Sequence, residues 1–187
     1  MLLPVTEIQP RSCKMPQNSD APGPIVSSAH LASGELPALS EFEFGLILVS
    51  HAFHRWIVRG MAAAGLTDLS PIDIFVLHSV HHRSKPKRLA DICLVLNIED
   101  THVVSYSVKK LERLKLVAST KLGKEKMISA TEEGSKACER YRSIRETLLV
   151  SPVASLGLEP ETLSRLASQM RTLSGYYDQA TRAAASL

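Results

Sequence analysis

Ten lysine and arginine residues gather between residues 84 and 126 of this 187-residue sequence. Only five acids share that stretch, so it has an excess of five positive charges, while the whole chain has a formal net charge of +3. Lysine and arginine neutralise phosphate groups, and a basic patch on one short segment is typical of contact with a nucleic-acid backbone. The ten cations are Lys85, Lys87, Arg88, Lys109, Lys110, Arg113, Lys115, Lys121, Lys124 and Lys126.

Other residues capable of chemistry do not assemble into a reactive pattern. His78 and His82 are four positions apart, a spacing that can chelate a metal from one helix face, but no carboxylate or cysteine completes the set. The cysteines Cys13, Cys93 and Cys138 form neither a CxxC pair nor a disulfide framework. The sequence has no glycine-rich phosphate loop, nucleophile elbow or HExxH motif. We therefore expect no metal, no cofactor and no enzyme.

Periodic apolar residues indicate which elements position the basic stretch. Two apolar stripes with helical spacing, at 89–96 and 104–111, flank the short polar segment 97–100. This pattern predicts a helix-turn-helix whose second helix covers about 100–115. Two β-prone runs then surround Gly123 and alternating charges, which predicts a hairpin. Together these elements predict a winged helix over about 68–131.

Long apolar helices flank this motif on both sides. Upstream, an S-x-x-E capping box at Ser40 predicts a helix over about 40–64, and Ser70 before a proline predicts the next helix start. Downstream, Thr131 predicts a helix cap, and the last helix has an apolar seam close to a heptad. Such a seam favours an interface between two copies. The predicted fold class is mainly α with a small β-hairpin: a winged helix-turn-helix flanked by long N- and C-terminal dimerisation helices.

The expected organisation is one folded domain with an N-terminal extension. Residues 1–38 are rich in proline and poor in bulky side chains, which predicts a flexible extension, and 39–187 form a single domain. Its dimerisation helices are expected at about 40–64 and 132–185, with an interruption at Ser151-Pro152. No apolar run approaches the ~20 residues of a membrane span, and no signal arrangement opens the chain. A cytoplasmic protein is expected.

Five short segments, in order along the chain, resemble motifs of one family. They are Leu69-Ser70-Pro71, Leu89-Ala90, Val103-Val104-Ser105-Tyr106, Leu111-Glu112 with Leu116-Val117, and Thr131-Glu132-Glu133-Gly134. Their register over about 40–185 resembles that of the MarR-type winged-helix transcription regulators, and the run 88–112 is similar to a bacterial subgroup of MarR-like regulators. The resemblance implies a homodimer that binds a pseudo-palindromic site in double-stranded DNA.

Three departures from the family pattern keep a second hypothesis open. The short segment 123–126 replaces a wing that usually has a D-x-R sequence, whose arginine enters the minor groove. Lys115 stands where the family commonly has glycine, and Glu99 and Asp100 place negative charge where phosphate would approach. The alternative is therefore a winged-helix protein-interaction module with weak or no DNA binding.

For a DNA-binding regulator, the residues of the winged helix divide by position. Side chains near the N-terminal end of the recognition helix are expected to meet base edges in the major groove. Cations on its later turns and on the wing are expected to meet phosphates or the minor groove. The expected DNA-binding residues are Arg88, Thr101, His102, Ser105, Tyr106, Lys109, Lys110, Lys124 and Lys126.

The resemblance also implies a possible small-molecule effector. Members of the family often bind small aromatic acids between the dimerisation helices and the winged lobe. In this sequence Phe53, Trp56 and Arg59 would line such a cavity, although core or interface packing explains the two aromatic residues more simply.

Overall fold

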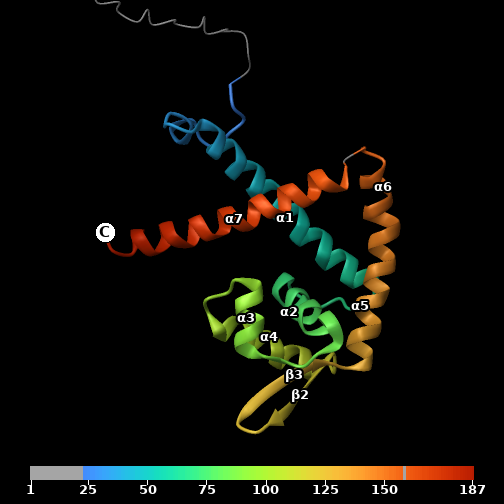
Figure 1. The fold of residues 1–187 in the computed structure, drawn as a ribbon. Coiled ribbons are helices and arrows are strands. Elements are labelled where there is room, and N and C mark those ends of the chain that lie inside the picture. Colours follow the sequence, from blue (N-terminus) through green and yellow to red (C-terminus); the bar gives the residue numbers. More distant parts are fainter. Residues whose placement is uncertain (1–22, 158) are drawn as a thin grey trace, which may run out of the picture. The chain divides into compact units, whose positions relative to one another are not determined.

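The computed structural model describes residues 23–157 and 159–187 (Figure 1). The chain divides into two compact units at a point within the first long helix. One unit ends at His51 and the other comprises Ala52–Leu187. Most of the predicted extension, including Cys13, lies outside the described residues. Residues 23–36 contain one short 3-10 helix, η1 (Ala29–Ala32).

The first long helix, α1 (Pro37–Ala63), begins earlier than the sequence indicated. Ser40 is not its cap. Its hydroxyl lies inside the first turn, is buried, and donates a hydrogen bond to the carbonyl of Leu31. Proline suits the first turn of a helix because its missing N–H has no partner there anyway, so Pro37 displaces the predicted start by one turn.

In the second unit, the helix-turn-helix has the predicted order. Ser70 caps α2 (Pro71–His81) through a complete capping box, and a short 3-10 turn, η2 (His82–Ser84), follows it. The motif itself consists of α3 (Leu89–Leu96) and α4 (Thr101–Arg113). Asn97 ends α3 in the left-handed conformation, with φ of 52°, which asparagine tolerates better than most residues.

The wing is the predicted hairpin with one added strand. β2 (Val117–Leu122) pairs antiparallel with β3 (Glu125–Ala130), and Gly123 provides the positive φ of the turn. A two-residue strand, β1 (Lys87–Arg88), pairs with the other edge of β3, so the sheet order is β1-β3-β2. This strand links the start of α3 to the wing.

A single apolar core joins these elements. Its fully buried side chains come from the end of α1, from α2, α3 and α4, and from the base of the wing. They include Met61, Ile74, Leu77, Ile92, Val104, Leu111, Leu116 and Ile128. The core therefore fixes one face of α4 and leaves the opposite face exposed.

The C-terminal helices depart from the prediction at one point. Thr131 caps α5 (Glu132–Arg145) as expected. The chain does not break at Ser151-Pro152, because a π-helical turn, η3 (Glu146–Val150), leads into α6 (Ser151–Ala154). A widened turn accommodates the ring and missing N–H of a proline that would disrupt a regular helix interior.

The last helix, α7 (Pro160–Ala184), has no buried residue. Within the described part of the chain, no helix is both long and apolar enough to cross a membrane.

Candidate nucleic-acid interface

The exposed face of α4 is the centre of the candidate interface. Asp100 caps the helix by accepting a hydrogen bond of 2.8 Å from the backbone N–H of His102. Thr101, His102 and Lys109 are exposed, Ser105 is half-buried, and Tyr106 is 73% exposed. The structure therefore brings the predicted base-reading residues to the side of α4 that the core leaves open.

Several cations of the basic stretch are already engaged by groups of the protein. Arg88 bonds Asp91 at 2.8 Å and reaches Glu125 of β3 at 3.4 Å, and the hydrogen bonds to these acids raise the pKa of its guanidinium. The ammonium of Lys87 donates a hydrogen bond of 2.7 Å to the carbonyl oxygen of His82 and so caps the end of α2. These two side chains brace the start of α3.

The wing is tied to α4 by a second set of contacts. Lys126 Nζ lies 3.1 Å from a carboxylate oxygen of Glu112, and the hydroxyl of Ser119 donates to the same carboxylate. The hydrogen bond from Ser119 and the charge of Lys126 hold the pKa of Glu112 below its ordinary value. The charge of Lys126 is thus shared between an internal acid and any external phosphate.

A buried ion pair locks α4 onto α2. Lys110 Nζ lies 2.7 Å from Asp73 Oδ2, and the two side chains are only 21% and 3% exposed. Burial alone would raise the pKa of Asp73, but the bonds from Lys110 and Ser70 outweigh it and lower the pKa. Lys110 was predicted to meet phosphate; in the structure its ammonium faces Asp73.

Seven cations of the stretch make no ion pair with any described residue, and one of them, Lys87, bonds backbone carbonyls. The other six are Lys85, Lys109, Arg113, Lys115, Lys121 and Lys124. Lys121 and Lys124 lie at the tip of the wing, and Lys109 and Arg113 lie on the exposed face of α4. These cations are the ones whose charge is most available to a partner.

Two hollows flank Tyr106. One, of about 230 Å³, is lined by Tyr106, Lys109, Lys110 and Arg113. The other, of about 480 Å³, lies between the N-terminal ends of α2 and α4 and includes Asp73 and Asp100 in its lining. The first hollow has no carboxylate in its lining, so anions are favoured there over the second.

Arg113 is the residue of this face that the sequence reasoning missed. On this helix Lys110 is the last predicted DNA-binding residue, although Arg113 follows Tyr106 by seven positions and therefore falls on the same side of a helix. Extending the helical spacing by one more turn would have included it.

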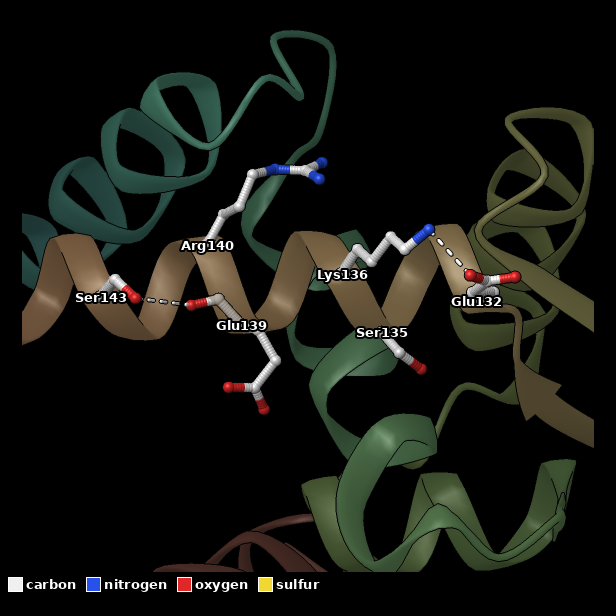
Figure 2. A pocket seen from close by; sticks show the side chains of 6 residues that line it. All are labelled: Glu132, Ser135, Lys136, Glu139, Arg140 and Ser143. Atoms are coloured by element: carbon white, nitrogen blue, oxygen red, sulfur yellow. Dashed lines mark hydrogen bonds and ion pairs between the residues drawn. The ribbon is translucent and has the colours of Figure 1, made fainter.

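A further hollow, of about 450 Å³, lies on the outer face of α5 (Figure 2). Several of its polar side chains bond one another or the backbone: Lys136 pairs with Glu132 at 2.8 Å, and Ser143 donates to the carbonyl of Glu139. Arg140 donates to the carbonyl of Ala64 at 2.8 Å. This face is a solvated helix surface that supports the fold.

The residues suggested for an effector are placed against aromatic neighbours. Phe53 stacks on Phe75 with ring centroids 6.0 Å apart, and Trp56 lies 6.4 Å from Tyr141. Arg59 is exposed. The effector site stays a prediction.

Comparison with known proteins identifies the motif. The family model described as a winged helix DNA-binding domain matches residues 69–134. No curated protein matches the sequence.

Solved structures of similar fold include transcription regulators. MepR of Staphylococcus aureus in its DNA-binding conformation has 18% identity and a TM-score of 0.60, covering 73% of this chain and 98% of MepR. The MarR-family regulator NMB1585 of Neisseria meningitidis has 18% identity and a TM-score of 0.59, covering 79% and 96%. CouR of Rhodococcus jostii RHA1, solved with p-coumaroyl-CoA, has 17% identity and a TM-score of 0.58, covering 71% and 90%.

These matches confirm the resemblance and the fold class predicted from the sequence. At such identities the solved structures establish the fold, while the family model establishes the motif. The chain therefore contains a winged helix of the DNA-binding type within the fold of the MarR-type regulators.

Proposed function

We propose that the protein is a sequence-specific DNA-binding transcription regulator that acts as a homodimer. The observation that supports this most directly is the exposed face of α4, where the polar residues His102, Ser105 and Tyr106 adjoin the exposed Lys109. In this proposal α4 enters the major groove, and the wing lies on the backbone or in the minor groove. The protein would have no catalytic role.

The contacts divide by the chemistry of each side chain. Thr101, His102, Ser105 and Tyr106 would meet base edges, because they occupy the N-terminal half of the recognition helix. Lys109 and Lys124 would neutralise phosphates. Arg88, Lys110 and Lys126 stay in the predicted set, but each would have to share its charge with an internal carboxylate.

The homodimer is supported by exposed apolar side chains on α7 and on α1. α7 is 25 residues long, and Leu163, Leu166 and Met170 along it are 42–48% exposed. On α1, Leu48 and Val49 are more than half exposed. Amphipathic helices bury such stripes against another element, and a second copy would supply it. Two winged helices would then read half-sites about one DNA turn apart.

The function can be tested by selection from pooled random duplexes with the full-length chain, followed by salt titration of the enriched duplex. We expect salt-sensitive enrichment of a pseudo-palindromic sequence. The molar mass of the complex would give the number of chains on one duplex. If the protein retains duplexes without salt sensitivity or sequence enrichment, the result would instead favour the protein-interaction module.

Removal of the wing lysines should weaken binding on all duplexes alike. The double substitution of Lys124 and Lys126 by alanine is expected to reduce the slope of log affinity against log salt by up to ~2. Lys124→Ala alone should reduce the slope more than Lys126→Ala alone, because Lys126 Nζ already lies 3.1 Å from a carboxylate oxygen of Glu112. Fluorescence anisotropy across a salt series measures both quantities. An unchanged slope in the double variant would show that these wing lysines do not contact the DNA backbone.

Substitutions at the N-terminal half of α4 should alter sequence preference. Ser105→Ala and Tyr106→Phe are each expected to reduce discrimination against mismatched duplexes by about 1 kcal/mol, because each removes a hydroxyl able to bond a base edge. The slope against salt should stay as in the wild type. Competition between selected and mismatched duplexes is the measurement. A uniform loss on both would indicate a role in folding or in backbone contact.

A further inference from the structure

Arg113 extends the exposed strip of α4 beyond the residues considered so far. His102, Tyr106, Lys109 and Arg113 follow the four-three-four spacing of one helix face, and all four are exposed. Arg113 lies about 10 Å along the helix axis from Tyr106, at a rise of ~1.5 Å per residue. It therefore stands at the far end of the strip from the residues placed to meet bases.

The guanidinium of Arg113 is not engaged by any acid of the described chain. The basic stretch contains one other arginine, Arg88, and that guanidinium is held by Asp91 and Glu125. The remaining unpaired cations of the stretch are lysines. Only arginine offers a planar fork that can bond two phosphate oxygens at once.

The surroundings of Arg113 favour an anion. It shares the hollow of about 230 Å³ with Tyr106, Lys109 and Lys110. The charge of Lys110 is directed to Asp73, and the charge of Lys109 also acts on Glu112, whose pKa it helps to lower. Arg113 therefore has the least engaged charge of the hollow, and Lys109, which makes no ion pair with a described residue, adds to it. No carboxylate lines the hollow, in contrast to the neighbouring hollow with Asp73 and Asp100.

We propose that Arg113, together with Lys109, clamps one backbone phosphate of DNA in this hollow. The clamp anchors the C-terminal end of α4 to the backbone while its N-terminal end meets the bases, and so sets the position of the helix along the groove. It supplies the arginine contact that the lysine-only wing tip does not offer. This assignment rests on the proposed function.

The test compares three single variants of the full chain on the selected duplex and on a random-sequence duplex. Arg113→Ala is expected to weaken binding about tenfold on both duplexes and to lower the salt slope by about 1. Arg113→Lys should restore the slope, since the charge remains, but only part of the affinity, since the fork is lost. The control is Arg142→Ala, which removes an arginine from the exposed face of α5 and should leave both quantities unchanged.

The outcomes separate the clamp from the proposed function. Wild-type chain that binds neither duplex in a salt-sensitive way would overturn the proposed function and the clamp with it. Wild-type binding that Arg113→Ala leaves unchanged would overturn the clamp alone. A loss confined to the selected duplex would also overturn it, because that result indicates a base contact. Thermal unfolding of each variant checks that the exposed substitution leaves the fold intact.

Discussion

Replacement of Gly134 by alanine is expected to lower the free energy of unfolding by about 3 kcal/mol. A Cβ atom at this position would lie 2.0 Å from the carbonyl oxygen of Leu116, a backbone atom that cannot rotate away. The same carbonyl accepts the N–H of Thr131 at 3.0 Å, and the Thr131 hydroxyl bonds the carbonyl of Lys115 at 2.7 Å. The added methyl group must therefore separate the first turn of α5 from the base of the wing.

Chemical denaturation followed by circular dichroism measures the loss at Gly134. The matched control is Ser135→Ala, which changes the next residue of the same turn on its outer side and should stay within about 0.5 kcal/mol of the wild type. Equal stability of Gly134→Ala and the control would show that the contact with Leu116 relaxes without cost. That result would contradict the packing described here.

Replacement of Asp73 by alanine is expected to lower the free energy of unfolding by about 3 kcal/mol as well. The substitution leaves the poorly exposed ammonium of Lys110 without its partner at 2.7 Å, and it removes the carboxylate that bonds the backbone N–H of Ser70. Of these two effects, the unpaired charge of Lys110 is expected to cost more free energy than the lost bond to Ser70. Because Lys110 belongs to α4, DNA binding should weaken together with stability.

A double variant tests the cause of the loss at Asp73. Asp73→Ala combined with Lys110→Met should be more stable than Asp73→Ala alone, since no isolated charge remains. If the double variant loses the sum of the two single effects, the ion pair is not the source of the stability.

The pH dependence gives an independent measure of the same pair. The pKa of Asp73 is lowered in the folded chain, so its contribution is complete above the unfolded pKa of about 4 and is lost as the pH falls through the folded pKa. The stability difference between the wild type and Asp73→Ala should therefore be constant near neutral pH and shrink in acid.

Local signals explain which parts of the fold could be predicted from the sequence. The caps at Ser70 and Thr131 depend on side chains three residues from the N–H groups that they satisfy. The turn at 97–100 and the hairpin around Gly123 are also set by short segments. Such features can be predicted from the sequence because the interacting groups are neighbours in the chain.

The contacts that decide the availability of each cation join distant positions. Lys110 meets Asp73, Arg88 meets Glu125, and neither pair leaves a signal in local spacing. A charge count treats all ten cations of the basic stretch alike, while the structure separates engaged from available ones. The boundary at Ser40 was wrong for a similar reason, because its hydroxyl bonds the carbonyl of Leu31, nine positions away. The break expected at Ser151-Pro152 was wrong because a π-helical turn accommodates the proline.

The lack of buried residues in α7 links the proposed assembly to the amount of protein present. Side-chain bonds join Asn97 to Ser174 and Asp178 of α7, but no residue of the helix is buried. A helix with so little packing frays in water, so α7 would gain its order largely from association. By mass action, dilution would then loosen α7 and dissociate the pair in the same concentration range. Occupancy of a paired operator would consequently rise more steeply than the first power of protomer concentration, which would make the regulator sensitive to its own rate of synthesis.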